Sequence, residues 1–394
     1  MHPRPKILIV DDEPFNVDYL EQELEDLNYA TVAARDGREA LAQVAAESPD
    51  LILLDIMMPV MDGFAVLERL KADKATRDIP VVVISAMNDL ASVARGIELG
   101  AEDYLPKPFD PVLLKARLTN GLEKKRLRDA EQLYLQGLER ELVIGREIQA
   151  EFLPRELPQP PGWEIAVHFQ AAREVAGDFY DAFTLDDSQR IGLIVGDVCG
   201  KGVGAALYMT LFRTLLRAFA SPDYFAGAAH PGNDADRLLQ SVMLTNQYVT
   251  QLHGDTSMYA TVFFGLIDPA NGLLTYMNCG HPPPLTLNAS GVKTRLTHTG
   301  PPIGAMADPP YSVKQMPIDP AEILLIVTDG AADAVDIDDQ FFGEKRLMAL
   351  LSETRVTTAA SLLDAISSTL RNHIGPATQF DDITLLAARR GESR

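Results

Sequence analysis

Short apolar runs alternate with stretches of helical hydrophobic periodicity through the first 120 residues of the chain. The predicted strands are residues 6–10, 29–34, 51–54, 80–84 and 102–105. The predicted helices are Pro14–Leu27, Gly37–Glu47, Gly63–Ala72 and Leu90–Leu99. This alternation predicts a doubly wound α/β domain, in which helices cover both faces of a five-stranded parallel sheet.

Polar residues follow four of the predicted strands at their carboxyl ends. They are Asp11 and Asp12 after the first strand, Asp55 after the third, Ser85 after the fourth and Lys107 after the fifth. In a doubly wound sheet these ends meet at one edge, where ligands bind. Clustered carboxylates repel one another unless a cation neutralises them, which predicts a Mg²⁺ site. Asp55 is then placed to accept a phosphoryl group, with Ser85 and Lys107 holding the phosphoryl oxygens.

Together with the turn Met57–Gly63, these residues resemble the receiver domain of two-component response regulators. The resemblance implies a flavodoxin-like fold over residues 1–120, phosphorylation of Asp55 by a sensor histidine kinase, and reorientation of Tyr104 on phosphorylation. It also implies Mg²⁺ ligation by Asp11, Asp12, Asp55 and the carbonyl of Met57. The alternative is an unrelated flavodoxin-like domain whose acidic residues only cap strands.

The next segment, residues 113–151, has no proline, carries charge throughout and contains three glycines. Its candidate seam positions are 127, 131, 134, 138, 142, 145, 149 and 152. This spacing predicts a long helix, a linker over residues 121–153, and a coiled-coil seam with one four-residue stutter. A solvated single helix is the alternative. A helix that bridges two domains has little else to pack against, which favours the coiled coil and a homodimer.

A second set of aspartates lies at strand ends or turns in the third predicted domain, residues 154–390. They are Asp178, Asp197, Asp329 and Asp381. Predicted strands include Ile191–Val195, Met258–Leu266, Leu273–Met277 and Ile323–Val327, and predicted helices span 203–220, 235–251 and 358–373. This pattern predicts an α+β sandwich of sheets flanked by helices.

Short runs around these aspartates resemble the metal-dependent PPM serine/threonine phosphatases, and within them the SpoIIE-type branch. The runs are Ile148–Pro154, Arg173–Asp181, Gly196–Gly202, Asn278–Pro284, Thr328–Gly330 and Phe380–Thr384. The resemblance implies a PPM-type β-sandwich that holds two Mn²⁺ or Mg²⁺ ions and hydrolyses phosphoserine or phosphothreonine on a protein.

Residue by residue, the resemblance implies that Asp197 bridges the two ions and that the Val198 carbonyl binds one of them. Asp329 and Asp381 complete the shell of the second ion, and Asp178 acts through bound water. Neighbouring Asp382 is the alternative ligand to Asp381, although the motif alignment favours Asp381.

Three positions near these motifs have less direct assignments. Arg173 is expected to bind the substrate phosphate, and a surface salt bridge is the alternative. Cys199 stands where eukaryotic members have a histidine proposed as the acid for the leaving group, so the acid is unassigned. His281 is a possible acid, with a structural role as the alternative.

The net charge of −21 argues against nucleic acid or anionic membrane as the main partner, because both reward basic surfaces. Two cysteines, Cys199 and Cys279, fit a reducing compartment. We expect no signal peptide and no membrane-spanning run, and therefore a cytoplasmic protein.

These inferences predict a response regulator whose phosphorylation at Asp55 controls a phosphatase. Family resemblance suggests that the substrate is a phosphorylated STAS-type anti-sigma-factor antagonist in a partner-switching pathway. The rival is a catalytically silent pseudo-phosphatase that sequesters a partner under receiver control. A transcription factor is disfavoured by the charge and by the lack of a helix-turn-helix pattern.

Overall fold

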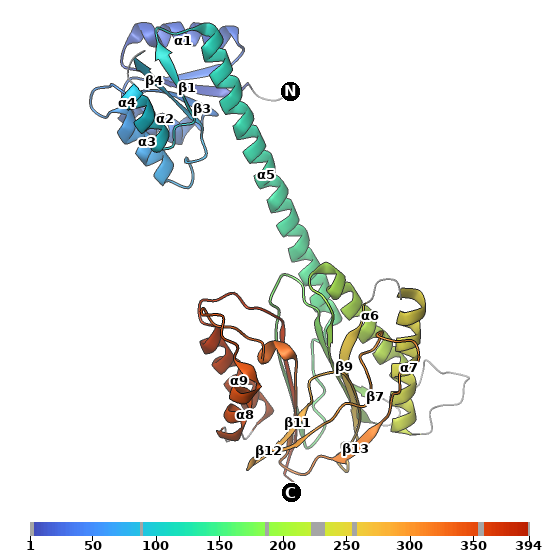
Figure 1. The fold of residues 1–394 in the computed structure, drawn as a ribbon. Helices are drawn as coiled ribbons and strands as arrows, with labels where there is room; N and C mark the ends of the chain where they lie inside the picture. Colours follow the sequence, from blue (N-terminus) through green and yellow to red (C-terminus); the bar gives the residue numbers. More distant parts are fainter. Residues whose placement is uncertain are drawn as a thin grey trace. The chain divides into compact units, whose positions relative to one another are not determined.

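The computed structural model describes residues 4–86, 90–185, 189–221, 233–253, 258–353 and 358–392. The chain divides into two compact units, Met1–Glu139 and Arg140–Arg394 (Figure 1).

The first unit contains a five-stranded parallel sheet in the order β2-β1-β3-β4-β5. Its strands are β1 (Lys6–Val10), β2 (Ala30–Ala34), β3 (Leu51–Asp55), β4 (Val81–Ala86) and β5 (Asp103–Lys107). Its helices are α1 (Pro14–Asp26), α2 (Gly37–Glu47), α3 (Gly63–Ala72), α4 (Leu90–Glu98) and the beginning of α5 (Pro111–Phe152). The predicted doubly wound fold is confirmed, and the predicted element ends lie within about two residues of those observed.

Successive residues of β1 point to opposite faces of the sheet and enter two separate cores. Leu8 and Val10 pack with residues of α2 and α3. Ile7 and Ile9 pack on the other face with residues of α1 and α5. Burial on both faces explains why the central strands are continuous apolar runs.

The predicted linker helix is confirmed as part of α5, which is continuous from Pro111 to Phe152. Leu127, Tyr134 and Leu138 on the predicted seam are exposed. The predicted seam is wrong at Gln149, because this side chain is buried against a loop of the second unit. Its amide donates to the Ala176 carbonyl (2.7 Å) and its oxygen accepts from the Ala176 N–H (3.0 Å).

The second unit contains two five-stranded sheets, in the orders β13-β10-β9-β8-β7 and β12-β11-β14-β15-β6, whose paired strands run antiparallel. The strands are β6 (Trp163–Gln170), β7 (Asp178–Leu185), β8 (Arg190–Val198), β9 (Ala260–Ile267), β10 (Leu273–Cys279), β11 (Leu285–Asn288), β12 (Gly291–Arg295), β13 (Lys314–Pro317), β14 (Ile323–Val327) and β15 (Ile383–Arg390). The helices are α6 (Val203–Ala220), α7 (Asp234–His253), η3 (Asp329–Ala331), α8 (Gly343–Glu353) and α9 (Ala359–Ile374).

The two sheets pack face to face, with helices on the outer faces (Figure 1). Strand β8 shows the alternation that this arrangement needs. Its residues Ile191, Leu193 and Val195 enter the core between the sheets. Ile194 points the other way, into the core beneath α6 and α7. A third core lies between the second sheet and helices α8 and α9. The predicted sandwich flanked by helices is confirmed.

Helix α6 corrects one expectation about membranes. Among the described residues, it is the single helix that is long and apolar enough to cross a bilayer by length and composition alone. Its residues Met209, Phe212 and Leu216 are fully buried in the core against the β13-β10-β9-β8-β7 sheet of the second unit. Core helices of this kind pass the same length and composition test, so the finding is weak support for a membrane span.

Candidate functional site

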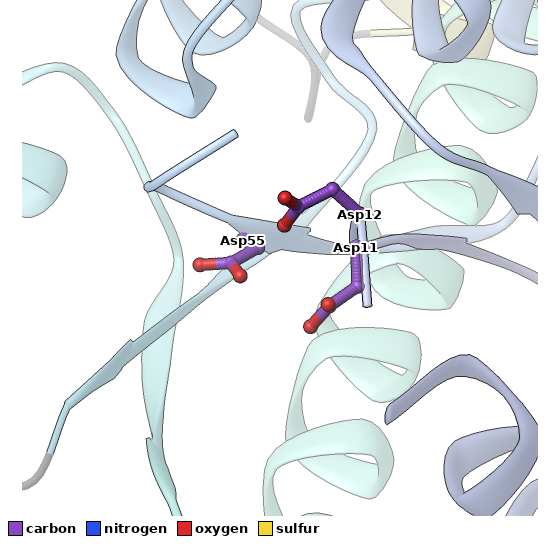
Figure 2. A group of neighbouring side chains, drawn as sticks. All are labelled: Asp11, Asp12 and Asp55. Carbon is purple, nitrogen blue, oxygen red and sulfur yellow. The ribbon is translucent and has the colours of Figure 1, made fainter. Parts of the chain in front are cut away.

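The first candidate site lies at the carboxyl ends of β1 and β3. Asp11, Asp12 and Asp55 each place a carboxylate oxygen within 4.8 Å of the others, and Figure 2 shows the three side chains where the strands end. Asp11 is completely buried and Asp55 is 5% exposed. Three converging carboxylates form a donor set that suits a hard divalent cation, so these residues fit the predicted Mg²⁺ site.

Lys107, at the end of β5, supplies positive charge to this cluster. Its Nζ lies 2.6 Å from Oδ2 of Asp55 and 3.0 Å from Oδ2 of Asp11. Burial raises the pKa of Asp55, and the hydrogen bond from Lys107 partly offsets that rise. Burial disfavours the charged form of Lys107, but its hydrogen bonds to Asp55 and Asp11 outweigh burial and raise its pKa. Lys107 therefore offsets part of the electrostatic cost of burying the Asp55 carboxylate.

Strand register brings Ser85 and Tyr104 to the same part of the sheet. Asp55 pairs with Ile84, so Ser85 stands one residue beyond it. The Ser85 hydroxyl is buried and has no hydrogen-bond partner in the described part of the chain. A buried hydroxyl without a partner is costly unless a ligand satisfies it, which fits contact with a phosphoryl group. Tyr104 is half-buried beneath the guanidinium of Arg117, 5.6 Å from the ring centroid.

The turn after β3 folds back over Asp55. The Met57 N–H donates to Oδ1 of Asp55 at 3.2 Å. A Cβ on Gly63 would lie 2.2 Å from the Asp55 carbonyl oxygen, so this close approach requires glycine. Asn16 was missed in the sequence analysis; its amide donates to both Asp11 oxygens, at 3.0 and 3.1 Å.

The second candidate site lies at one edge of the sandwich, where both sheets contribute aspartates. Antiparallel pairing of β7 and β8 sets Asp178 opposite Asp197. In the other sheet, Asp329 directly follows Thr328 at the end of β14, and Asp381 precedes β15, which pairs with β14. A Cβ on Gly330 would lie 1.9 Å from the Asp382 carbonyl oxygen, so the two turns are in close contact.

Asp178 is almost completely buried, and two hydroxyls fix its carboxylate. Thr328 and Thr384 donate to its Oδ2 at 2.8 and 2.6 Å. Burial, followed by the charge of Asp197, raises its pKa well above the ordinary value. Neither threonine was predicted as a site residue, although they lie in the Thr328–Gly330 and Phe380–Thr384 motifs.

Asp197 lies near three other carboxylates. Burial, followed by the carboxylates of Asp329, Asp381 and Asp382, raises its pKa to about 7. Neighbouring carboxylates repel one another when charged, and a divalent cation with oxygen ligands would relieve this repulsion. Convergence within 4.8 Å, however, is found in the described ranges only for the first site.

The neighbouring carboxylates of Asp381 and Asp382 have different partners. Asp382 is buried and accepts from the backbone N–H groups of Ala172 (2.8 Å), Gly177 (2.8 Å) and Asp178 (3.3 Å). Asp381 is half-buried, and its Oδ2 lies 2.8 Å from Nζ of Lys201. Asp382 therefore holds the loop before β7, whereas Asp381 has a cation as its side-chain partner.

The three remaining predicted positions also have distinct surroundings. Arg173 is exposed and makes no ion pair or hydrogen bond with any described residue. His281 is completely buried, and burial lowers its pKa to about 3, which favours a structural role. Cys199 is half-buried, and its sulfur accepts from the Tyr259 N–H at 3.2 Å.

Comparison with protein families identifies both domains of the chain. The family described as Stage II sporulation protein E (SpoIIE) matches residues 187–391, just over half of the chain. The chain belongs to the SpoIIE family. The response regulator receiver domain family matches residues 7–119. The SpoIIE-family chain thus joins an N-terminal receiver domain to a C-terminal domain of the PPM phosphatase type.

Individual relatives each match part of the chain. Protein IcfG of Synechocystis sp. is 43% identical over 264 residues, which are 64% of this chain and 41% of that protein. Response regulator PleD of Caulobacter vibrioides is 50% identical over 113 residues, 29% of this chain and 25% of PleD. The chain therefore spans less than half the length of either relative. The SiaA-PP2C domain of Pseudomonas aeruginosa shares the fold, with a TM-score of 0.54 and 22% identity over 65% of this chain and 98% of that domain.

Proposed function

We propose that this protein is a response regulator in which phosphorylation of Asp55 controls a metal-dependent protein serine/threonine phosphatase. One observation carries the proposal: at the edge of a PPM-type sandwich, burial and then the carboxylates of Asp329, Asp381 and Asp382 raise the pKa of Asp197 to about 7. A partly buried carboxylate surrounded by three others is costly for stability and is typical of a metal or catalytic site.

In the receiver, Asp55 is the proposed phosphoacceptor. A phosphoryl group would pass from a phosphohistidine of a sensor histidine kinase to an Asp55 oxygen. Asp11, Asp12, Asp55 and the Met57 carbonyl would hold Mg²⁺, which would offset the negative charge of this transfer. Lys107 and the buried Ser85 hydroxyl are the proposed contacts for the phosphoryl oxygens. Tyr104 is the proposed aromatic switch.

In the phosphatase domain, Asp197, Asp329 and Asp381 would hold two Mn²⁺ or Mg²⁺ ions, with the Val198 carbonyl as a further ligand and Asp178 acting through water. When bound, two such cations supply a hydroxide nucleophile at neutral pH and neutralise the attacked phosphoryl group. Thr328 and Thr384 keep the Asp178 carboxylate in one orientation.

Arg173 and Asp381 have surroundings that support their proposed roles. The exposed Arg173 guanidinium has no protein partner in the described chain, so it is free to bind the substrate phosphate. The three backbone N–H groups bound by Asp382 favour Asp381, rather than Asp382, as the metal ligand.

The proposed substrate is a phosphorylated STAS-domain anti-sigma-factor antagonist in a partner-switching pathway. This choice rests on the resemblance of the sequence motifs to the SpoIIE-type branch. The protein would act as a cytoplasmic homodimer, with no nucleic acid or membrane as partner. The exposed Leu127, Tyr134 and Leu138 of α5 support a dimer through this part of the helix.

A catalytically silent pseudo-phosphatase is the second candidate. It is favoured by the ion pair between Lys201 and Asp381, which gives one proposed metal ligand a protein cation as partner. A binding module of this kind would retain the partner protein without releasing phosphate.

The two candidates are distinguished by phosphate release from a phosphorylated STAS protein at saturating Mn²⁺. We expect turnover by the wild-type chain and a loss of about 100-fold or more in Asp197→Ala, since even outer-shell changes at metal sites cost roughly 10- to 100-fold. An inactive but folded wild type, tested on several phosphoproteins, would establish the binding module instead.

A further inference from the structure

A cavity of about 190 Å³ adjoins the second candidate site and has no role in the functions proposed above. Thr328, Asp329 and Ala332 line it at one end. Asp329 is thus shared between the cavity and the acidic cluster, and its side chain is exposed to solvent. A molecule that reached the proposed metal ions would lie next to this cavity.

The walls of the cavity are mainly apolar and come from three parts of the fold. Leu285 of β11 and Val327 of β14 belong to the second sheet, and Leu347 and Met348 belong to α8. Aliphatic and thioether groups offer dispersion contacts and release of water, but few hydrogen bonds. This chemistry suits an apolar side chain rather than a phosphate or a sugar.

Two prolines complete the wall and account for a motif that the metal site leaves unexplained. Pro282 and Pro283 line the cavity and lie in the run Asn278–Pro284. His281, just before them, is buried, and its N–H donates to the Asn278 side chain at 2.9 Å. The run therefore presents a rigid apolar surface, because proline fixes its own backbone dihedral φ.

Charged groups occupy the rim of the cavity. Arg295 of β12 and Glu344 of α8 both line it and form an ion pair with each other. Both side chains remain partly exposed. Because each charge is already paired, the rim offers no strong net attraction for a free anion or cation.

We propose that this cavity binds an apolar side chain of the substrate protein that lies close to the phosphorylated serine or threonine. The inference rests on the proposed phosphatase function and adds the specificity that the metal site lacks, since metal ions and Arg173 recognise only phosphate. Burial of one aliphatic side chain would distinguish substrates by about 10-fold or more in kcat/KM.

The test uses the full chain with Mn²⁺ and synthetic phosphoserine peptides that carry leucine, serine or aspartate at single positions flanking the phosphoserine. We expect at least one position where leucine raises kcat/KM by about 10-fold over serine. Met348→Trp, which fills the cavity, should remove that preference and leave hydrolysis of p-nitrophenyl phosphate unchanged. Met348→Leu should retain the preference.

Leu350→Trp is the matched control, because Leu350 is also a half-buried residue of α8 but does not line the cavity. It should keep the leucine preference.

A wild type with equal kcat/KM for all peptides, or a folded Met348→Trp that keeps the preference, would overturn the inference. If the wild type hydrolyses neither peptide nor p-nitrophenyl phosphate, the proposed function is wrong. In that case, fluorescence anisotropy of labelled peptides tests binding to the cavity. Unchanged binding of the leucine peptide by Met348→Trp would overturn the inference about the cavity.

Discussion

Asp381 and Asp382 are adjacent in the Phe380–Thr384 motif but have different roles. Among the described residues, Asp382 accepts from three backbone N–H groups, whereas the partners of the Asp381 side chain are its neighbour's N–H and Lys201. Asp382 therefore stabilises a loop, whereas the Asp381 carboxylate is available to bind a metal ion in place of Lys201.

Substitution of each aspartate by asparagine separates these tasks. Asp382→Asn should lower the free energy of unfolding by about 1–3 kcal/mol, because an NH₂ group replaces an acceptor and leaves buried N–H groups unpaired. Asp381→Asn should change it by less than about 0.5 kcal/mol, as is usual away from the core, yet abolish metal-dependent turnover. Urea unfolding without metal and phosphate release with Mn²⁺ measure the two effects. Full turnover by Asp381→Asn would contradict its assignment as a ligand.

Asp55 can be tested in the same way. Asp55→Asn should abolish phosphorylation by a small labelled phosphodonor, because an amide is a poor nucleophile and removes one charge from the proposed Mg²⁺ site. The receiver should remain folded, as judged by circular dichroism. Label on the folded variant at the wild-type level would show that another residue accepts the phosphoryl group.

Single residues were predictable from sequence where a short motif surrounds them, and their partners were not. Asp11, Asp12 and Asp55 follow strands whose ends meet in any parallel sheet, so their convergence could be predicted. The hydroxyls of Thr328 and Thr384 reach Asp178 across 150 and 206 residues of sequence. No local pattern predicts these contacts, because they need both the pairing of β14 with β15 and the packing of that sheet against the sheet that holds β7.

Secondary-structure elements were likewise predictable from local sequence patterns, whereas their tertiary contacts were not. Strands such as β3 are buried on both faces and are recognisable as apolar runs, and α6 matches its predicted bounds. Strands β6 and β12 have mixed burial, with exposed or half-exposed residues, and were not singled out. Helix α5 was predicted, but the docking of Gln149 onto Ala176 was not, since a polar residue on a helix gives no sign of its partner.

Helix α5 also provides a test of communication between the domains. We predict that phosphorylation acts through this helix and through α6, which begins six residues after Asp197. Inserting two residues near Gly137 turns one helix end by about 200° relative to the other. The insertion should change both the basal rate and the response to a phosphoryl mimic.

A seven-residue insertion at the same position is the control, because it adds nearly two whole turns of roughly 3.6 residues each. It should restore most of the response. Equal rates and responses for the wild type and both insertions would exclude coupling through the helix, without affecting the chemistry of either domain.

At the scale of the whole molecule, the chain joins a receiver domain to a domain of the PPM phosphatase type. Each has aspartates at the ends of strands, and bound cations would offset their mutual repulsion. Sequence predicted both domains because their motifs are local. It could not specify the sign of control, because that depends on the energy difference between two states of the whole chain.

The most direct test of this account is the rate of phosphate release from a phosphorylated STAS protein at saturating Mn²⁺, with and without beryllofluoride as a phosphoryl mimic on Asp55. We predict that the mimic raises the wild-type rate by about 5- to 150-fold, equivalent to a coupling of roughly 1–3 kcal/mol. It should have no effect on Asp55→Asn. A wild-type rate that is measurable but identical with and without the mimic would contradict control of the phosphatase by the receiver.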